Sequence, residues 1–356
     1  MNSLQKQLLF MSTPVGALGT GQGGGVELTV QNVAQELQQR GYQIEVVAPT
    51  GSKLKGIKVT EIAGNLQVAV QTQGRNVPIC MPEDSVLANM WEYGRKVQHN
   101  YDLMVNFAFD WLPFYLTPFF NTKIAHFISM GSMTQGLDEI MNQIAQNYPN
   151  CIGVYTKSQA NTFPFADKCH ILSSAIALSL YNFCDTPEDS MAWLGRIAPE
   201  KALEDAVAAA QITGIPLKIY GRIQDEAYWK TIQQDFPDAP IEYMGFLETK
   251  ELQQELGKCR ALIMTPRWIE AFGNVAIEAL ACGVPVIAYR RGGPSEIVRN
   301  GKTGFLVEPD SIDGLVTAMQ NINQIERINC RKQAETEYSL TVLGDNFETW
   351  FNKILF

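Results

Sequence analysis

The sequence predicts an α/β protein with two doubly wound domains in tandem, and three observations support this prediction. Short apolar runs alternate with helical stretches, as in parallel sheets covered by helices on both faces. The alternation pauses at 180–189, a polar stretch that contains a proline, and then starts again. The length of 356 residues suits two domains of roughly 150 residues each. We therefore expect domains at 1–180 and 190–340.

The first domain is predicted to begin with a β-α-β unit. A buried strand at 7–12 leads into a glycine-rich loop at 16–25 and then a helix at 26–40, whose apolar residues recur every three or four positions. An apolar, β-branched strand at 43–48 follows, and Pro49 ends it. Further strands are expected at 102–107, 123–128, 151–156 and 170–172.

The second domain repeats this order. A strand at 191–194 precedes a helix at 199–213, which Gly214 closes, and a strand at 217–220 follows. Further strands are expected at 241–244, 261–264, 284–289 and 304–307. Ligands of such sheets bind outside the carboxyl ends of the strands, so we expect the two domains to face each other across a ligand cleft.

Composition and charge exclude several classes of function. The net charge of −9 disfavours nucleic acid and anionic membrane surfaces as partners, so any polyanionic ligand must be held by a few placed cations. The apolar run at 103–120 is interrupted by polar residues and prolines, which argues against membrane insertion. Seven cysteines without a C-x-x-C pair, and a start without a signal-peptide pattern, favour the cytoplasm.

The first glycine-rich loop contains G-x-G-x-x-G at 19–24, immediately before a helix. Three interpretations are open: a nicotinamide-dinucleotide site, a backbone cradle for another anion, and a loop without a ligand. The dinucleotide site also needs an acidic residue at the end of the second strand. Glu45 lies inside that strand, which disfavours this interpretation.

Two clusters at predicted strand ends in the second domain indicate a phosphate-containing ligand. Arg196 and Lys201 follow the strand 191–194, and a guanidinium and an ammonium beside a helix start suit a diphosphate. Glu270 and Glu278 flank a helix start predicted at Gly273, where unpaired backbone N–H groups can meet phosphate oxygens. The alternatives are solvated surface cations and scattered carboxylates.

Together these segments resemble the retaining glycosyltransferases of family four. The resemblance rests on Gly195-Arg196 with Lys201, on the spacing from Glu270 to Glu278, and on the runs ACGVPVIA and GGPSEIV that begin at 281 and 292. It covers about 191–310, with weaker agreement near the first loop. It implies the glycosyltransferase-B fold, with an acceptor-binding first domain, a nucleotide-sugar-binding second domain, and a last helix at 341–356 that packs back on the first.

The resemblance also implies roles for individual residues. Arg196 and Lys201 would hold the donor diphosphate, Glu270 the donor sugar and Glu278 the ribose. The remaining donor contacts would come from Gly24, Gly25, Phe246, Leu247, Phe272, Gly273 and Asn274. His126, near the end of its strand, would contact the donor sugar and join Arg196, Lys201 and Glu270 as a catalytic residue. A satisfied buried histidine is the alternative.

The implied reaction is hexosyl transfer with retention of configuration. No D-x-D pair occurs in the chain, so we expect no metal or other cofactor, with Arg196 and Lys201 stabilising the leaving diphosphate. Segments 10–16 and 23–29 are similar to UDP-glucose:tetrahydrobiopterin glucosyltransferases. This narrower resemblance implies UDP-glucose as donor and a pterin as acceptor. The acceptor would be bound by Glu27, Phe107, Asp110 and Trp111, although core packing also explains the aromatic residues.

Three alternative functions follow from the same residues. A transferase acting on a lipid or polysaccharide needs a basic amphipathic surface on the first domain, yet helix 26–40 contains only Arg40 as a basic residue. A non-catalytic sugar-nucleotide sensor would bind the donor without transferring the sugar. A nicotinamide oxidoreductase would be stabilised by NAD rather than by UDP.

Overall fold

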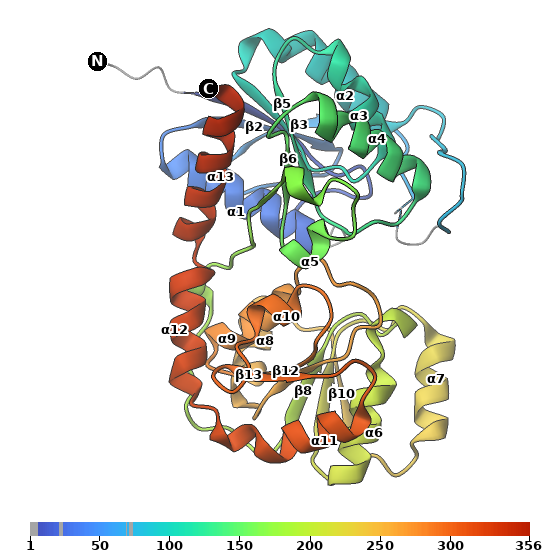
Figure 1. The fold of residues 1–356 in the computed structure, drawn as a ribbon, viewed down its shortest axis with the longest axis vertical. Coiled ribbons are helices and arrows are strands. Elements are labelled where there is room, and N and C mark those ends of the chain that lie inside the picture. Colours follow the sequence, from blue (N-terminus) through green and yellow to red (C-terminus); the bar gives the residue numbers. More distant parts are fainter. Residues whose placement is uncertain (1–5, 21–23, 69, 71–73) are drawn as a thin grey trace. The chain divides into compact units, whose positions relative to one another are not determined.

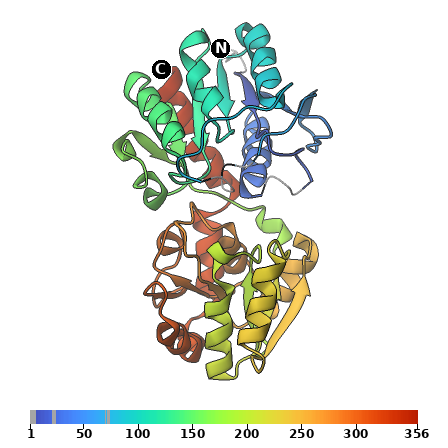
Figure 2. The same ribbon diagram turned by 90° about the vertical axis from the view of Figure 1, so that its right-hand side faces the viewer.

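The computed structural model describes residues 6–20, 24–68, 70 and 74–356, and these form two compact units. Unit 1 contains the chain up to Ser174 together with Leu340–Phe356, and unit 2 is Ala175–Ser339. Each unit is a parallel sheet with helices packed against it (Figure 1 and Figure 2). The prediction of two doubly wound α/β domains is confirmed.

The sheet of unit 1 has seven strands in the order β3-β2-β1-β4-β5-β6-β7. They are β1 (Gln7–Met11), β2 (Gln43–Pro49), β3 (Lys58–Ile62), β4 (Leu103–Asn106), β5 (Ile124–Ile128), β6 (Ile152–Val154) and β7 (Cys169–Ile171). All pairs are parallel, and β3 is an edge strand that the sequence analysis did not predict. Its partly exposed residues lack the apolar run that marks the buried strands.

The edge of this sheet is held by a buried carboxylate on β2. Glu45 is 5% exposed and accepts hydrogen bonds from Thr60 (2.7 Å), Tyr93 (2.7 Å) and Tyr101 (2.9 Å), and it also pairs with Lys58. Burial by itself would raise the pKa of Glu45, but these four donors outweigh it and lower the pKa to about 2. Glu45 therefore has a structural task inside the sheet.

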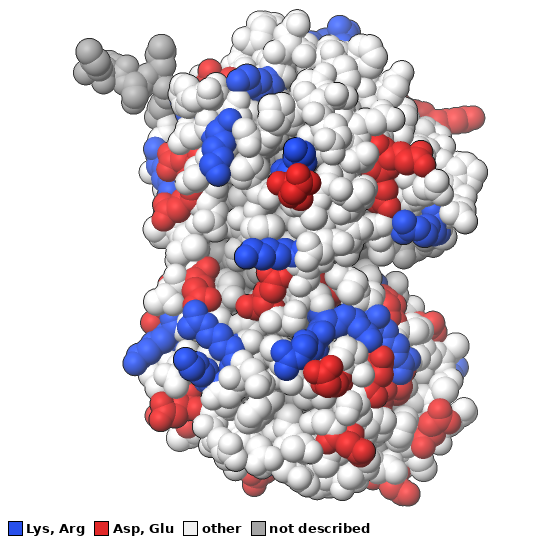
Figure 3. Space-filling view, viewed as in Figure 1, with Lys and Arg blue, Asp and Glu red and all other residues white. Residues whose placement is uncertain are grey.

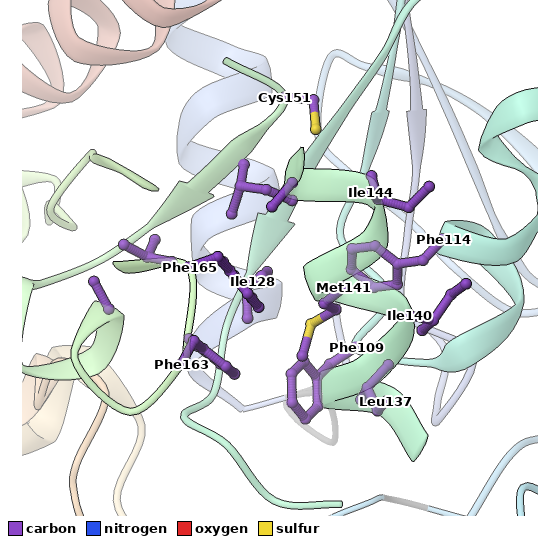
Figure 4. Close-up of a cluster of buried hydrophobic side chains, with 14 residues drawn as sticks. Phe109, Phe114, Ile128, Leu137, Ile140, Met141, Ile144, Cys151, Phe163 and Phe165 are labelled. Atoms are coloured by element: carbon purple, nitrogen blue, oxygen red, sulfur yellow. The ribbon is translucent and has the colours of Figure 1, made fainter. Parts of the chain in front are cut away.

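Helices cover both faces of the first sheet. They are α1 (Gly25–Gln39), α2 (Val86–Val97), α3 (Trp111–Leu116), α4 (Gln135–Asn147), α5 (Lys157–Ala160) and α13 (Leu340–Leu355). One core cluster joins α3 and α4 to β5 and β6, with Phe114, Met141 and Ile144 among the side chains that interdigitate there (Figure 4). This packing fixes the loop between β5 and α4.

The last helix, α13, packs on α1 within unit 1 (Figure 1). Arg40, which follows α1, forms ion pairs with Asp345 (2.7 Å) and Glu348 (3.2 Å). Phe347 packs against Phe127 of β5 with tilted rings whose centres are 5.5 Å apart, and the indole N–H of Trp350 donates to the carbonyl of Asn150 (2.7 Å). The final helix is thus part of the core of unit 1.

Unit 2 has a six-stranded parallel sheet in the order β10-β9-β8-β11-β12-β13. Its strands are β8 (Met191–Leu194), β9 (Leu217–Tyr220), β10 (Ile241–Gly245), β11 (Leu262–Met264), β12 (Val286–Tyr289) and β13 (Gly304–Val307). Its helices are α6 (Leu203–Thr213), α7 (Glu226–Asp235), α8 (Thr249–Lys258), α9 (Asn274–Ala281), α10 (Pro294–Ile297), α11 (Ile312–Asn321) and α12 (Arg327–Glu337).

Two expectations for unit 2 differ from the structure. The helix predicted at 199–213 begins only at Leu203, because Pro199–Lys201 forms a 3-10 turn and Ala202 adopts a left-handed conformation with φ 44°. The stretch 180–189, expected as a linker, lies along unit 2, where the N–H of Glu188 donates to the carbonyl of Lys258 (2.7 Å). Among the described residues, no helix is both long and apolar enough to cross a bilayer.

Candidate functional site

The segments that leave the carboxyl ends of β8, β9, β10 and β11 contain most of the predicted donor-site residues of unit 2. In a parallel sheet these ends share one edge, so short loops bring their side chains together. On the face that Figure 3 shows, several Lys and Arg side chains of unit 2 adjoin one another, with Asp and Glu side chains next to them.

Lys201 and Glu270 form an ion pair across this edge, although they are 69 residues apart in the sequence. Their side chains are only 19% and 16% exposed. Trp268 joins them, because its indole N–H donates to the same carboxylate oxygen (3.0 Å) and its ring lies 4.8 Å from Lys201 Nζ. The pair is thus held in place by an aromatic ring that the sequence analysis did not single out.

Arg196 lies on the turn that follows β8. Its guanidinium forms an ion pair with Glu200 (3.1 Å) and a hydrogen bond with the side-chain carbonyl of Gln224. The side chain of Arg196 is 36% exposed, more than that of Lys201. Gln224 and Glu200 thus orient a guanidinium that remains accessible to a ligand.

Glu278 is on α9, where it is half-buried and accepts a hydrogen bond from the hydroxyl of Tyr181 (3.2 Å). Burial raises the pKa of Glu278 to about 7, and the single hydrogen bond from Tyr181 opposes this shift. The backbone carbonyl of Tyr181 in turn accepts from Arg331 of α12 (2.8 Å). Tyr181 was missed because it lies in the stretch expected to be a linker.

The backbone around the start of α9 is closely packed. Gly273 caps this helix with φ 99°, which confirms the predicted helix start, and Asn274 is its first residue. The N–H of Gly293 donates to the carbonyl of Glu270 (2.7 Å), and a Cβ on Gly293 would lie 2.2 Å from the carbonyl oxygen of Phe272. The glycines that precede α10 therefore fix the backbone of 270–272.

Asn274 has a side-chain oxygen, Oδ1, that is buried without a hydrogen-bond partner among the described residues. Such an atom at a helix start marks a place where a ligand can supply the missing donor. Phe272, by contrast, is buried (5% exposed) and packs edge-on against Tyr338 at 6.0 Å, so only its backbone can serve a ligand.

The loop after β10 places Phe246 and Leu247 at the same edge. Phe246 is 55% exposed, and the guanidinium of Arg222 lies over its ring at 4.4 Å. Leu247 is half-buried. Arg222 follows β9 and was not predicted; an arginine stacked on an exposed ring offers a flat, cationic surface for a planar base.

In unit 1, Gly24 and Gly25 lie at the start of α1. Gly24 caps the helix with φ 63°, Gly25 is its first residue, and both are exposed. Residues 21–23 of the predicted glycine motif lie outside the described residues. Glu27 is 7% exposed, and its carboxylate accepts a hydrogen bond from the backbone N–H of Gly19. This hydrogen bond ties the glycine-rich loop to α1, which contains Glu27.

The prediction that His126 contacts a donor sugar is wrong for this structure. His126 is fully buried in β5, stacked on Phe114 with centroids 4.4 Å apart. Its two ring nitrogens are engaged by Asn106 (3.2 Å) and Thr117 (2.9 Å), and burial lowers its pKa to about 3. The structure therefore makes it a neutral, satisfied core residue, which was the stated alternative.

The predicted acceptor residues Phe107, Asp110 and Trp111 differ in how far they are exposed. Phe107 is fully buried between Phe10 (5.2 Å) and Phe127 (5.7 Å), so its assignment as an acceptor contact is wrong. Asp110 caps α3 and accepts from Gln67 (3.0 Å), and burial raises its pKa. Trp111 is half-buried and stacks on Tyr115 at 4.5 Å. Of these three, only Asp110 and Trp111 retain accessible surface.

Comparisons with known proteins match the chain to glycosyltransferases. Residues 185–337 match the family described as "Glycosyl transferases group 1". The chain is 25% identical to D-inositol 3-phosphate glycosyltransferase of Nocardia farcinica over 91% of this chain and 83% of that protein. It is 32% identical to sulfoquinovosyl transferase SQD2 of Arabidopsis thaliana over 36% of this chain and 25% of that protein. The chain thus spans only a quarter of SQD2, and 8% of a sucrose synthase of Solanum tuberosum.

Solved structures match over nearly the whole chain. Anabaena Alr3699/HepE in complex with UDP and glucose aligns with a TM-score of 0.78 over 98% of this chain and 100% of that one, at 16% identity. Sucrose-phosphate synthase from Thermosynechococcus elongatus aligns with a TM-score of 0.78 over 98% and 99%, at 17% identity. The predicted glycosyltransferase-B fold is confirmed.

Proposed function

We propose that this protein is a retaining glycosyltransferase that transfers glucose from UDP-glucose to a small soluble acceptor, tetrahydrobiopterin or a related pterin. The observation that supports this most is the set of Arg196, Lys201, Glu270 and Glu278 on one edge of a sheet, within the stretch that matches group 1 glycosyltransferases. HepE, a structural neighbour, was solved with UDP and glucose, which supports the choice of donor.

The donor diphosphate is proposed to bind to Lys201 and Arg196. Lys201 forms an ion pair with Glu270, and Arg196 forms one with Glu200. A diphosphate carries more charge than a carboxylate and draws both cations toward itself. Glu270, once released from Lys201, can accept hydrogen bonds from sugar hydroxyls.

The other groups of the site orient the nucleoside and the phosphates. The ionised carboxylate of Glu278 is proposed to accept hydrogen bonds from the ribose hydroxyls. Arg222 and Phe246 offer a flat surface to the base, and the first N–H groups of α9 point toward phosphate oxygens. These contacts use unit 2 alone.

Catalysis in this proposal is the stabilisation of a leaving group. When the bond between glucose and phosphate breaks, negative charge grows on the diphosphate, and preorganised cations bind this form more tightly than the ground state. The absence of a D-x-D pair in the sequence supports a metal-independent reaction. The acceptor is proposed to attack from the face that the diphosphate leaves, so no carboxylate nucleophile is required. A leaving phosphate oxygen can take the proton of the acceptor, so no separate general base is required either.

The acceptor is proposed to bind to unit 1, where Asp110 and Trp111 offer a carboxylate and an aromatic ring. The cytoplasm is the proposed compartment, because all seven cysteines are free thiols. The first alternative is a transferase whose acceptor is a lipid or a polysaccharide. The second is a protein that binds the nucleotide sugar without transferring the sugar.

The test compares Lys201→Ala with Lys258→Ala. Lys258 also pairs with a carboxylate in unit 2, Glu255 (2.6 Å), but it lies at the end of α8, away from the proposed site. With UDP-glucose and tetrahydrobiopterin, followed by mass spectrometry, we expect Lys201→Ala to reduce transfer about 100-fold or more. Lys258→Ala should match the wild type, and both should unfold at similar temperatures.

Wild-type transfer by Lys201→Ala would refute its assigned role. Transfer from UDP-glucose to lipid vesicles or a polysaccharide, but not to the pterin, would replace the acceptor. Tight binding of UDP-glucose without transfer or slow hydrolysis would indicate a sensor, and stabilisation by NAD rather than UDP would indicate an oxidoreductase.

A further inference from the structure

Lys201 lies on an irregular stretch of backbone between β8 and α6. The 3-10 turn Pro199–Lys201 ends at Ala202, whose φ of 44° is in the left-handed region. A residue with a Cβ rarely adopts this conformation, because the Cβ then lies too close to the following carbonyl oxygen. Ala202 is also fully buried, so its backbone groups depend on partners within the protein. Interactions with the rest of unit 2 must therefore hold this turn in place.

The chain that follows β11 binds three successive carbonyl groups of this turn. The hydroxyl of Thr265 donates to the carbonyls of Lys201 (3.1 Å) and Ala202 (2.8 Å), so one proton is shared between two acceptors. The backbone N–H of Arg267 donates to the carbonyl of Glu200 (2.9 Å). Of these two donors, the hydroxyl is the one that a substitution can remove without altering the backbone.

Thr265 is itself held firmly by the sheet of unit 2. It directly follows β11 and is only 1% exposed. Its hydroxyl oxygen accepts a hydrogen bond from the indole N–H of Trp193 (3.4 Å), which belongs to the neighbouring strand β8. The hydroxyl therefore connects two paired strands in the middle of the sheet to the backbone of the turn.

The two ends of the Lys201 side chain differ in how easily their contacts can change. In the proposed function, the ammonium group leaves Glu270 and binds the donor diphosphate. The contact between the carbonyl of Lys201 and the hydroxyl of Thr265 is buried, so a ligand does not compete for it. Because the lysine side chain is a flexible four-carbon chain, the position of its backbone limits where the ammonium can reach.

We propose that Thr265 is a positioning residue, which holds the backbone of Lys201 where the ammonium group reaches the donor diphosphate. This inference rests on the proposed function, because it concerns the donor contact assigned there to Lys201. Thr265 does not touch the donor and acts only through Lys201. Without the hydroxyl, the left-handed turn can relax, and donor binding must then restore its shape at a cost in affinity.

The test measures the Kd for UDP-glucose by calorimetry with the full-length chain. No acceptor is needed, so the result does not depend on the identity of the acceptor. Thr265→Val removes the hydroxyl and keeps the size of the side chain, and we expect it to bind UDP-glucose about fivefold or more weakly. Thr265→Ser keeps the hydroxyl and should restore the affinity to within about twofold of the wild type.

Thr303→Val is the matched control. Thr303 is also 1% exposed, and its hydroxyl accepts a hydrogen bond from the backbone N–H of Arg299 (3.1 Å). It precedes β13, however, and so lies at the opposite edge of the same parallel sheet. Thr303→Val should lower the melting temperature, as Thr265→Val does, but should bind UDP-glucose like the wild type. Equal weakening of UDP-glucose binding by both variants would mean that lost stability explains the effect, and would overturn the inference.

A double-mutant cycle tests whether Thr265 acts through Lys201. In a chain that already carries Lys201→Ala, we expect Thr265→Val to change the Kd for UDP-glucose by less than about twofold. A purely structural role would not produce this difference between the two backgrounds. If Thr265→Val weakens binding by the same factor with and without Lys201, the inference is wrong.

The same measurements separate this inference from the proposed function. If Lys201→Ala weakens UDP-glucose binding but Thr265→Val does not, the positioning role is refuted while the donor site stands. If Lys201→Ala binds UDP-glucose as tightly as the wild type, the role of Lys201 in donor binding fails, and the positioning role fails with it. Should Thr265→Val not fold, Thr265→Cys replaces it, because a thiol donates only weakly. We then expect about threefold weaker binding, and unchanged binding would refute the positioning role.

Discussion

Donor binding is expected to depend on pH through Glu278. Its pKa is raised to about 7 by burial, and only the ionised carboxylate accepts hydrogen bonds from both ribose hydroxyls. About 90% of Glu278 is then ionised at pH 8 and about 10% at pH 6. If the ionised form alone binds, the Kd for UDP-glucose rises about tenfold between these pH values, or about 1.4 kcal/mol.

The surroundings of Glu278 make this dependence assignable. Unit 2 itself contains no histidine, because His99, His126 and His170 all belong to unit 1. The nearby Tyr181 and Cys282 have pKa values raised by burial, which keeps both neutral between pH 6 and 8. UDP-glucose is preferred to UDP as the probe, because its diphosphate has no ionisation in this range.

Calorimetry of UDP-glucose binding from pH 5.5 to 8.5 tests the prediction. Glu278→Gln should bind more weakly at pH 8 and should lose the pH dependence. Glu251→Gln is the control, since Glu251 is an exposed carboxylate on α8. Equal affinity of the wild type at pH 6 and pH 8, or an unchanged tenfold dependence in Glu278→Gln, would show that Glu278 does not hold the ribose as an anion.

Two further predictions concern the sheet edge of unit 1 and the backbone of the proposed site. Because the pKa of Glu45 is lowered to about 2, its ionised form stabilises the fold above the unfolded pKa of 4.5, and this contribution is lost as the pH falls toward 2. Urea denaturation should therefore show Glu45→Gln to be less stable by about 3 kcal/mol at pH 7, with a smaller difference at pH 3; an equal difference at both would contradict the assignment. Gly293→Ala places a Cβ 2.2 Å from the carbonyl oxygen of Phe272, so stability should fall by about 1–3 kcal/mol and UDP-glucose binding more than tenfold. Gly74→Ala, with open space around its Cβ, is the control, and normal UDP-glucose binding by Gly293→Ala would exclude a role for this backbone.

The regular parts of the fold were accessible from sequence because they are local. The bounds predicted for β8, β9 and β13 agree with the structure, since these strands are short runs rich in apolar residues, bounded by turns. The start of α9 at Gly273 was also predicted, because a glycine in a left-handed conformation separates a loop from a helix. By contrast, β3 was not predicted, because it is a partly exposed edge strand without an apolar run.

Burial could not be predicted for residues inside the first sheet. Both faces of a parallel sheet are covered, so alternation along β4 and β5 does not separate core side chains from accessible ones. Phe107 and His126 were therefore assigned to ligands although both are fully buried. The partners of His126, Asn106 and Thr117, are 20 and 9 residues away, and no short motif links them.

In the proposed donor site, too, the residues could be predicted from the sequence but their contacts could not. Arg196, Lys201, Glu270 and Glu278 were found because they belong to motifs with fixed short spacing. The contacts that orient them were not, because Lys201 meets Glu270 across 69 residues and Tyr181 meets Glu278 across 97. The identities of these residues could thus be predicted from the sequence. Their ion pairs and the raised pKa of Glu278 could be found only from the folded structure.

The packing of α13 on α1 has a consequence for biosynthesis. Ala175–Ser339 is one uninterrupted stretch and can complete its core during translation as soon as it leaves the ribosome. The other unit must wait for Leu340–Leu355, so Phe127 lacks the cover of Phe347 until the ribosome has made α13. Unit 1 is therefore begun before unit 2 and completed after it, and during that interval its uncovered apolar surface is exposed to aggregation.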